Sequence, residues 1–367
     1  MLWFVLNRLP LGRVSTEAAG DDGFVDAWAA YRDVNLAIAG EIARIAEVGE
    51  AVVVNDYQLA LVPEMLTHLR DDVRTVFFLH TAFPGRRWFN VLPELAREQL
   101  VNAWRSKSVG FHSARWQRAF QETAVRTHTF VAPLAPDAVE LKRLAESSVA
   151  AAARRDLETV VDPAASLILR VERLDPTKNA VRGVRAFELL LNREPRWRQR
   201  VQMLFCAVPS RNGVEAYEAY RLRLEQAILD VNERHGGPTW TPIVFLERDD
   251  YIHSVAAFER YDVLFVNSIS DGMNLVAKEG PILNRFDGVL CLSPETGAFD
   301  ELGKVSVPAY PLNTWQTAGA LHHALSMPKA ERAARAVELR SLSTQPSPAT
   351  WLSAVARQAT YEGRTIQ

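Results

Sequence analysis

The stretch Ser166-Leu-Ile-Leu-Arg-Val-Glu-Arg-Leu-Asp-Pro-Thr-Lys178 carries the pattern that decides the fold. Its first six residues are mostly apolar, which is typical of a strand buried on both faces. A polar loop follows, and the residues from Ala180 onward have the spacing of a helix. Buried strands that alternate with helices predict a parallel sheet covered on both faces.

The same strand–loop–helix unit recurs on both sides of this stretch. The expected strands are residues 51–54, 75–79, 108–111, 166–171, 201–206, 242–246, 262–266 and 288–292. The expected helices are residues 24–45, 92–104, 180–191, 213–235, 274–285 and 349–361, with one or two more in 138–160. These segments predict an α/β protein of two doubly wound, Rossmann-like halves that face each other across a cleft.

The length of the chain also favours two domains. A single hydrophobic core seldom holds 367 residues. We place the boundary near Asp162-Pro163, which gives a first domain of residues 1–162 and a second of residues 163–347. A C-terminal helix within residues 348–367 is expected to pack back on the first domain.

Charge and hydropathy exclude several classes of protein. The net charge of −2 predicts no overall attraction to nucleic acid or to acidic lipid. No apolar run approaches the ~18 residues of a membrane-spanning helix, and the first residues lack the basic region of a signal peptide. We therefore expect a cytoplasmic protein without a nucleic-acid or membrane partner, and a homo-oligomer remains open. Cys206 and Cys291 lie in apolar runs and are expected to be buried thiols.

Two polar strings follow strands of the second half. In Arg173-Leu-Asp-Pro-Thr-Lys178 both cations can turn toward one phosphate, although the loop can equally be a helix cap with solvated bases. In Asp271-Gly-Met-Asn-Leu-Val-Ala-Lys-Glu279, Gly272 permits a tight turn, and the free N–H groups at the start of a helix suit a diphosphate. Glu279 lies two turns further on, where a carboxylate can accept two ribose hydroxyls. The alternative is an ordinary capped helix with an exposed glutamate.

Single polar residues at other strand ends are further candidates, because ligands collect at the carboxyl ends of parallel strands. Asp56 can bind sugar hydroxyls, and His80 can donate to one or act as an acid or base, although a lone histidine there is more often structural. Arg211 offers another guanidinium, but arginine is so frequent in this chain that a surface role is the default. The histidines show no metal-ligand spacing, so no metal is expected.

Taken in order, five strings resemble motifs of the trehalose-6-phosphate synthases, which are retaining glycosyltransferases of the GT-B type. Arg173 to Lys178 resembles the family's Arg-Leu-Asp-Tyr-Ser-Lys, and Asp271 to Glu279 is identical to its Asp-Gly-Met-Asn-Leu-Val-Ala-Lys-Glu. The other strings are Asn55-Asp-Tyr-Gln58 (family His-Asp-Tyr-His), Phe77 to Pro84 (family Phe-Phe-Leu-His-x-Pro-Phe-Pro) and Ala207-Val-Pro-Ser-Arg211 (family Pro-(Thr)-Ser-Arg). The resemblance covers roughly residues 50 to 350.

This resemblance implies a UDP-, GDP- or ADP-linked sugar donor held by the second domain and a phosphorylated sugar or polyol acceptor on the first. The leaving phosphate would take the acceptor's proton in a front-face substitution, so no enzyme nucleophile, metal or other cofactor is expected. The implied catalytic residues are Arg173 and Lys178 on the diphosphate, with His80 and Asp271 on the donor sugar. The implied binding residues are Met273, Asn274, Leu275 and Glu279 for the donor, with Asp56 and Arg211 for the acceptor.

The chain also departs from the family's pattern. The family begins with a glycine-rich loop that bears an arginine, and no such loop is found here, so a truncated first domain is expected. Gln58, Ala82 and Pro176-Thr177 replace family residues. These changes resemble a divergent branch that includes pseudo-glycosyltransferases, which couple a nucleotide-linked cyclitol to an amino cyclitol phosphate through a C–N bond. That coupling is one alternative function, and a non-catalytic nucleotide or sugar-phosphate binder is another.

Overall fold

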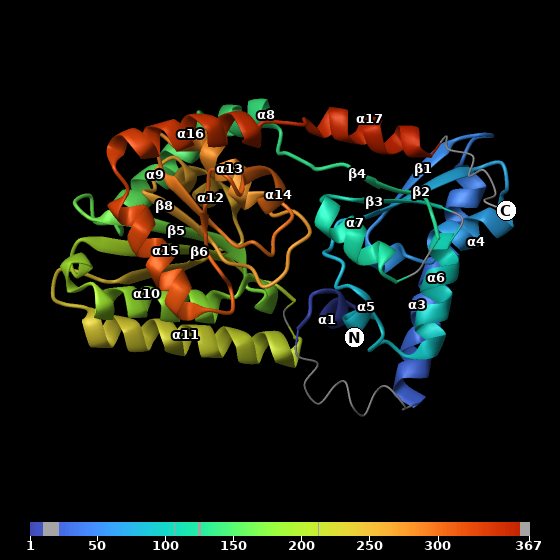
Figure 1. The fold of residues 1–367 in the computed structure, drawn as a ribbon, viewed down its shortest axis with the longest axis horizontal. Coiled ribbons are helices and arrows are strands. Elements are labelled where there is room, and N and C mark those ends of the chain that lie inside the picture. Colours follow the sequence, from blue (N-terminus) through green and yellow to red (C-terminus); the bar gives the residue numbers. More distant parts are fainter. Residues whose placement is uncertain (10–21, 106, 124–125, 212, 360–367) are drawn as a thin grey trace. The chain divides into compact units, whose positions relative to one another are not determined.

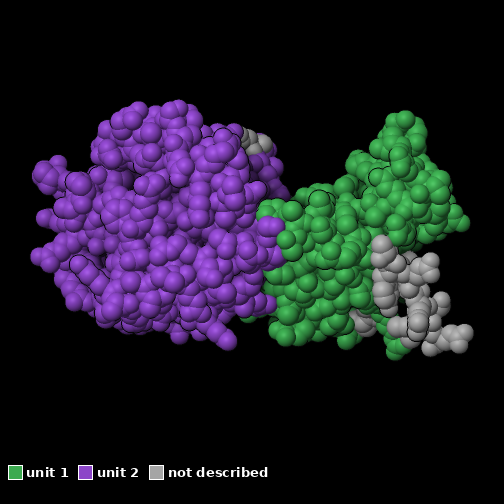
Figure 2. All heavy atoms as spheres, turned by 90° about the horizontal axis from the view of Figure 1, so that it is seen from above, with its two compact units in different colours: residues 1–134, 271–273, 348–367 green, residues 135–270, 274–347 purple. Residues whose placement is uncertain are grey.

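A computed structural model describes residues 1–9, 22–105, 107–123, 126–211 and 213–359 of the chain (Figure 1). The chain forms two compact units, coloured separately in Figure 2. The first unit contains residues 1–134, 271–273 and 348–367, and the second contains residues 135–270 and 274–347. The sheet of each unit is parallel, as the apolar strands predict.

The first unit has a four-stranded sheet covered on both faces. Its strands follow one another in the order β1 (Ala51–Asn55), β2 (Arg74–Leu79), β3 (Ser108–Phe111) and β4 (Thr129–Val131). Phe77 and Leu79 pack with the helices on one face, whereas Val76 and Phe78 face α17 (Pro348–Gln358) on the other. The remaining helices are α1 (Leu2–Leu6), α3 (Asp22–Ile45), η1 (Tyr57–Leu59), α4 (Val62–Leu69), α5 (Arg86–Phe89), α6 (Glu94–Arg105) and α7 (Ala114–Gln121).

The second unit has a six-stranded sheet in the order β10-β9-β8-β5-β6-β7. These strands are β5 (Ser166–Arg173), β6 (Val201–Val208), β7 (Ile243–Glu247), β8 (Val263–Val266), β9 (Val289–Leu292) and β10 (Val307–Pro308). Strands are added outward from β5 as far as β7, and β8 then starts on the other side of β5. The order therefore reverses between β5 and β8, where doubly wound sheets bind their ligands. The described strands of the first unit show no such reversal, which differs from the expectation of two doubly wound halves.

Helices and 3-10 turns connect the strands of the second unit. They are α8 (Ala138–Ala145), α9 (Ser148–Glu158), η2 (Pro176–Lys178), α10 (Ala180–Arg193), η3 (Pro195–Trp197), α11 (Glu215–His235), α12 (Tyr251–Phe258), α13 (Val276–Leu283), α14 (Phe299–Leu302), α15 (Thr314–Ser326) and α16 (Lys329–Ser343). None of the helices in the described part of the chain has the length and apolar character needed to cross a bilayer.

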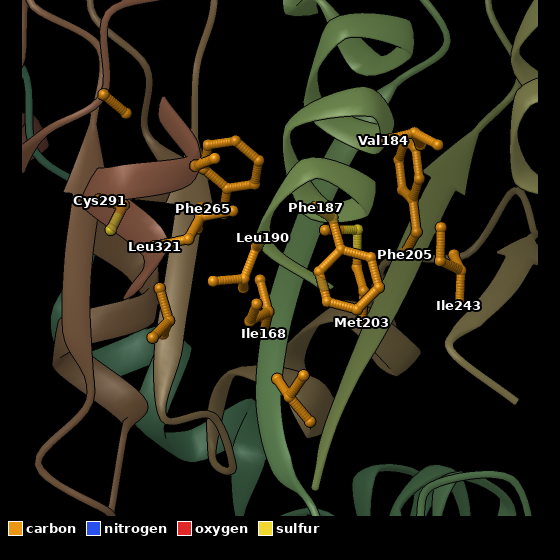
Figure 3. Close-up of a cluster of buried hydrophobic side chains, with 14 of the residues drawn as sticks. Ile168, Val184, Phe187, Leu190, Met203, Phe205, Ile243, Phe265, Cys291 and Leu321 are labelled. Carbon is orange, nitrogen blue, oxygen red and sulfur yellow. The ribbon is translucent and has the colours of Figure 1, made fainter. Parts of the chain in front are cut away.

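The core of the second unit lies between its sheet and the helices α10, α11 and α15. Val184, Phe187 and Leu190 lie three residues apart and therefore share one face of α10. They pack with side chains of the sheet that include Ile168 and Phe205 (Figure 3). Removing a large apolar side chain such as Phe187 from water stabilises the fold by about 1.5–3 kcal/mol. This packing fixes α10, and with it the loop that joins α10 to β5.

The boundary between the units lies after Leu134, which is earlier than the expected position near Asp162. The reason is the placement of α8 and α9, which pack on α13 and α12 of the second unit. An ion pair of 2.7 Å between Arg154 and Glu259 joins α9 to the residue after α12. The Ala/Arg/Glu-rich composition of 138–160 predicts surface helices but does not tell which sheet they cover.

The helices α4, α7, α12 and α16 were not among the elements expected from the sequence. The short strands β4 and β10 were not predicted from the sequence, and the helix expected at residues 274–285 begins at Val276. Residues 360–361 of the expected last helix lie outside the described residues. Cys206 and Cys291 are buried, unbridged thiols in β6 and β9, as predicted.

Candidate functional site

The loop that carries Arg173 and Lys178 meets the segment after β8 at the point where the strand order of the second sheet reverses. The loop after β5 and the loop after β8 are joined by a backbone hydrogen bond, in which Ile269 N–H donates to the Thr177 carbonyl at 2.8 Å. The side-chain amide of Asn179 donates to the Asn267 carbonyl at 3.1 Å and to the Pro311 carbonyl at 2.7 Å. The structure therefore holds the first string against residues 267–269, the segment that leads into the second string, at the carboxyl edge of the sheet.

The loop that carries Arg173 and Lys178 is held by a buried carboxylate. Arg173 is the exposed last residue of β5, and Lys178 ends the single turn of η2. Asp175 accepts from the Thr177 N–H at 2.9 Å and from the Tyr217 hydroxyl at 2.9 Å. Asp175 thus caps η2, so its task is structural, and it keeps the two cations at the two ends of one short, fixed loop.

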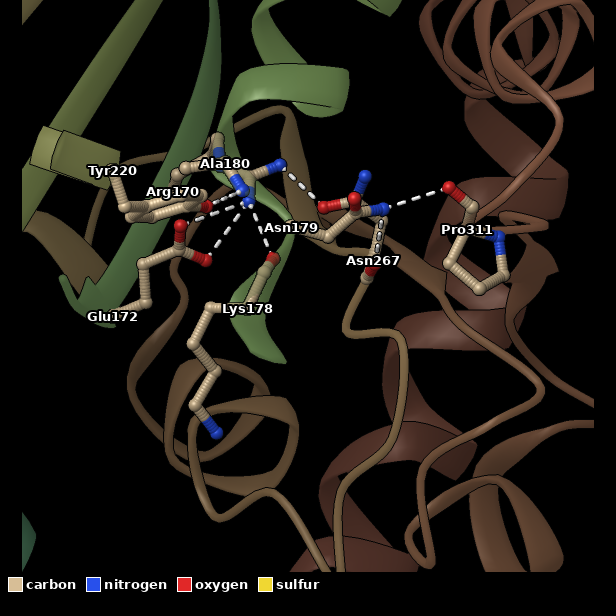
Figure 4. A network of polar contacts seen from close by, with 8 residues as sticks. All are labelled: Arg170, Glu172, Lys178, Asn179, Ala180, Tyr220, Asn267 and Pro311. Carbon is tan, nitrogen blue, oxygen red and sulfur yellow. Dashed lines mark hydrogen bonds and ion pairs between the residues drawn. The ribbon is translucent and has the colours of Figure 1, made fainter. Parts of the chain in front are cut away.

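A second buried charge lies beneath the same loop. The guanidinium of Arg170 is fully buried, and donates to the Glu172 carboxylate at 2.8 and 3.0 Å and to Asn267 Oδ1 at 2.7 Å (Figure 4). It also donates to the carbonyl of Lys178 at 3.2 Å. Burial raises the pKa of Glu172, an effect that Arg170 opposes. This network ties the backbone of Lys178 to β5 and to the end of β8. The sequence did not predict this role for Arg170, which lies inside an apolar strand.

Asn179 provides the turn between η2 and α10. Its φ of 63° and ψ of 31° lie in the left-handed region, which asparagine tolerates better than most residues. The next residue, Ala180, donates its N–H to the Tyr220 hydroxyl at 2.7 Å, which satisfies one free donor at the start of α10. Burial raises the pKa of Tyr220, so the phenol stays protonated.

The second string begins one turn before α13. Asn274 has a φ of 81°, and its Oδ1 accepts from the Ala277 N–H at 3.0 Å. The helix therefore starts at Val276, two residues later than expected, and Asn274 already satisfies one of its first donors. Leu275 accepts from two N–H groups of the first turn. Asp271 and Met273 belong to the first unit, whereas Asn274 and Leu275 belong to the second.

Gly272 is required by a close approach of two backbones rather than by the tight turn that the sequence suggested. Its φ is not in the left-handed region, but a Cβ at this position would lie 1.6 Å from the carbonyl oxygen of His80. The indole N–H of Trp116 donates to the Gly272 carbonyl at 3.1 Å. Any side chain at position 272 would therefore displace the segment from His80.

Glu279 and its neighbour Lys278 have different surroundings. Lys278 is fully buried and forms an ion pair of 2.8 Å with Glu301, so it holds α13 to α14. Glu279 accepts from the Tyr251 hydroxyl at 2.9 Å. Burial raises the pKa of Glu279, and the bond from Tyr251 lowers it. Tyr251 begins α12, far from Glu279 in the sequence, and was not predicted as part of the site.

In the first unit, His80 is linked to the ends of neighbouring strands. Its Nδ1 lies 3.0 Å from His112 Nε2, and its Nε2 lies 2.9 Å from Asn55 Oδ1. Burial lowers the pKa of His80, so its imidazole is neutral at pH 7. The described residues contain no group of three or more His, Cys, Asp or Glu side chains that could hold a metal ion.

The proposed acceptor residues lie in different units. In the first unit, Asp56 has a φ of 65°, and its carboxylate accepts from the Thr81 N–H at 3.1 Å and the Thr81 hydroxyl at 2.9 Å. It thereby fastens the ends of β1 and β2. In the second unit, Arg211 follows β6 with a φ of 50°, and its guanidinium carbon lies 5.3 Å from the centre of the Tyr217 ring. Tyr217 in turn connects this loop to Asp175.

Comparison with known proteins identifies the family. Residues 1–131 and 124–361 match the model of glycosyltransferase family 20. The chain belongs to glycosyltransferase family 20. It is 32% identical over 329 residues to a bifunctional trehalose-6-phosphate synthase/phosphatase of Thermoproteus tenax, covering 84% of this chain and 44% of that protein. It is 30% identical over 332 residues to the UDP-forming α,α-trehalose-phosphate synthase of Yarrowia lipolytica, covering 84% and 70%.

A solved structure of a family 20 relative shares the fold. A UDP-forming α,α-trehalose-phosphate synthase from Burkholderia xenovorans, in complex with glucose 6-phosphate, superposes with a TM-score of 0.88 and 27% identity, covering 98% of this chain and 82% of that one. The resemblance to the trehalose-6-phosphate synthases is thus confirmed, and the α/β fold is the GT-B fold of these enzymes. The chain spans less than half the length of the Thermoproteus tenax protein.

Proposed function

We propose that this chain is a retaining glycosyltransferase of the trehalose-6-phosphate synthase type. It moves a sugar from a nucleotide diphosphate to a phosphorylated sugar or polyol. The observation that carries the proposal is the meeting of the Arg173–Lys178 loop with the loop that leads to α13, at the reversal point of the second sheet. Because relatives are described as UDP-forming and one is bound to glucose 6-phosphate, UDP-glucose and glucose 6-phosphate are the substrates to test first.

In this proposal the donor is held mainly by the second unit. Arg173 binds the diphosphate with a bidentate fork, and Lys178 binds it as a point charge. The positive end of α13 and the amides near Met273, Asn274 and Leu275 add to the field around the phosphates. Glu279 accepts the two ribose hydroxyls.

The reaction is a substitution at the anomeric carbon, in which the new bond forms on the same face of the sugar as the bond that breaks. The bond between the anomeric carbon and the diphosphate oxygen breaks, and a hydroxyl of the acceptor forms the new bond to that carbon. The acceptor's proton passes to the leaving phosphate, whose negative charge Arg173 and Lys178 stabilise. Removal of either cation costs about 3 kcal/mol of transition-state stabilisation. His80 and Asp271 contact the donor sugar, and Asp56 and Arg211 contact the acceptor.

The test is turnover of UDP-glucose with glucose 6-phosphate, followed by UDP release and by NMR of the new anomeric centre. We expect an α-linked product. GDP-glucose and ADP-glucose are tested as donors in parallel. Lys178→Ala should slow turnover about a hundredfold, whereas Lys142→Ala, which alters an exposed lysine of α8, should leave it unchanged.

Two results would reject this assignment. Nucleotide binding without turnover of any nucleotide sugar would indicate a non-catalytic binder. Turnover only of a nucleotide-linked cyclitol with an amino cyclitol phosphate would indicate the pseudo-glycosyltransferase reaction instead.

A further inference from the structure

A row of hydrogen bonds crosses the carboxyl edge of the first unit's sheet. Asn55 is the last residue of β1, and His80, His112 and Ala132 each directly follow one of the next three strands. His80 Nε2 lies 2.9 Å from Asn55 Oδ1, and His80 Nδ1 lies 3.0 Å from His112 Nε2. His112 Nδ1 lies 3.3 Å from the Ala132 carbonyl oxygen. Four adjacent strand ends are thus linked through two imidazoles.

The end of this row fixes the position of each proton. The Ala132 carbonyl can only accept, so His112 carries its hydrogen on Nδ1. A neutral His112 then has a lone pair on Nε2, which must accept from His80 Nδ1–H. A neutral His80 is left with its own lone pair on Nε2. In this state the amide nitrogen of Asn55 faces that lone pair, because the two ends of an asparagine amide are assigned from their partners.

The surroundings favour the neutral forms. His112 is 4% exposed, and both imidazoles contact the ring of Phe78. Trp351 of α17 packs against His80 and donates its indole N–H to the Ala132 carbonyl at 3.1 Å. The carboxylate of Asp56 is a nearby charge that raises the pKa of His80, but burial outweighs it.

We propose that His112 is a positioning residue that holds His80 as its Nδ1–H tautomer, with the Nε2 lone pair at the edge of the sheet. His80 then accepts a hydrogen bond from a hydroxyl of the donor sugar instead of donating one. The hydroxyl replaces the amide of Asn55 at the same lone pair. This inference rests on the proposed function only in taking a sugar as the ligand of His80; the tautomer itself does not depend on it.

The first test is nitrogen NMR of the full chain labelled with 15N-histidine at pH 7.5, with His80→Gln used to assign the signals. The wild-type protein should show a protonated Nδ1 and an unprotonated Nε2 at His80. His112→Phe should abolish this preference, and His112→Gln should restore it because its amide oxygen can accept from Nδ1–H. His128→Phe, which alters a histidine bonded to Gln358 outside the row, should leave it unchanged.

Kinetics provide the second test. His112→Phe should lower kcat/KM for the nucleotide sugar by about tenfold, the effect of one misdirected hydrogen bond, and His112→Gln should recover most of it. A wild-type His80 protonated on Nε2 or on both nitrogens would overturn the inference, and that measurement requires no variant to fold. Unchanged kinetics in folded His112→Phe would also overturn it. If the wild-type protein turns over no nucleotide sugar, the proposed function fails, and the NMR result alone decides the role of His112.

Discussion

Lys178 and Lys278 occur in similar strings of polar residues, but their different burial gives them different roles. Lys178 is half-buried at the end of η2, on a loop fixed from below by Arg170. Lys278 has no exposed surface and forms an ion pair with Glu301. A buried amine that already holds a carboxylate stabilises the fold only as part of that pair. The candidate site therefore includes Lys178. It also includes Glu279 but not the preceding residue, Lys278.

The environment of Glu279 predicts a pH dependence of donor binding. Burial raises its pKa, so it takes up a proton at a higher pH than an ordinary carboxylate. Only the ionised form accepts two ribose hydroxyls, and affinity for UDP-glucose should fall as the pH is lowered through this raised pKa. Calorimetric titration between about pH 5 and pH 8 measures the effect, since the two phosphates of UDP-glucose do not titrate there. In Glu279→Gln the affinity should be lower and should vary less with pH than in the wild type, and a pH profile identical to that of the wild type would contradict the assignment.

Two glycines in helices are expected to respond in opposite directions to the same substitution. A Cβ at Gly183 would lie 2.3 Å from Arg170 Nη1, so Gly183→Ala must push the buried guanidinium from its partners. The expected loss of stability is about 1–3 kcal/mol. A Cβ at Gly319 of α15 meets nothing within 4 Å, and Gly319→Ala should stabilise by about 0.5–1 kcal/mol. Urea unfolding of both variants tests the pair, and equal shifts would argue against the buried network.

At the scale of elements, the connection from β5 through η2 to α10 depends on Asn179. Its left-handed backbone and its two amide hydrogen bonds hold the loop that carries Lys178. Asn179→Gly keeps the backbone and removes the amide, whereas Asn179→Ala also adds strain at positive φ. We expect UDP affinity to fall in the glycine variant and to fall further, with about 1 kcal/mol more loss of stability, in the alanine variant. Calorimetry and urea unfolding measure both, and a more stable alanine variant would contradict this account.

The elements that the sequence predicted are those with a local signal. Continuous apolar runs such as 75–79 marked the long strands, and the identical string 271–279 marked the family. β10 has two residues, one of them a proline, so it carries no pattern of its own. Arg170 and Tyr251 were missed as supports of the site because their partners are set by tertiary packing.

At the scale of the molecule, the chain returns at its C-terminal end to the unit in which it began. Val355 of α17 is fully buried against the face of the first sheet that carries Val76 and Phe78. Val355→Asp would bury an unpaired charge and should lower the unfolding temperature of the first unit by about 6 °C or more. Leu352→Asp places the same charge at a position of the same helix that is 53% exposed, and should change it little. Scanning calorimetry of both variants is the test, and an unaffected Val355→Asp would show that α17 is not part of this core.

The Arg173–Lys178 loop meets residues 267–269, which lead into the second string. A diphosphate site at this place is tested most directly by the binding of UDP and of uridine to the wild-type protein and to Lys178→Ala. If the loop holds a diphosphate, the variant should bind UDP about tenfold or more weakly and bind uridine as the wild type does. Equal affinity of wild type and variant for UDP, or an equal loss for both ligands, would contradict a diphosphate site at this place.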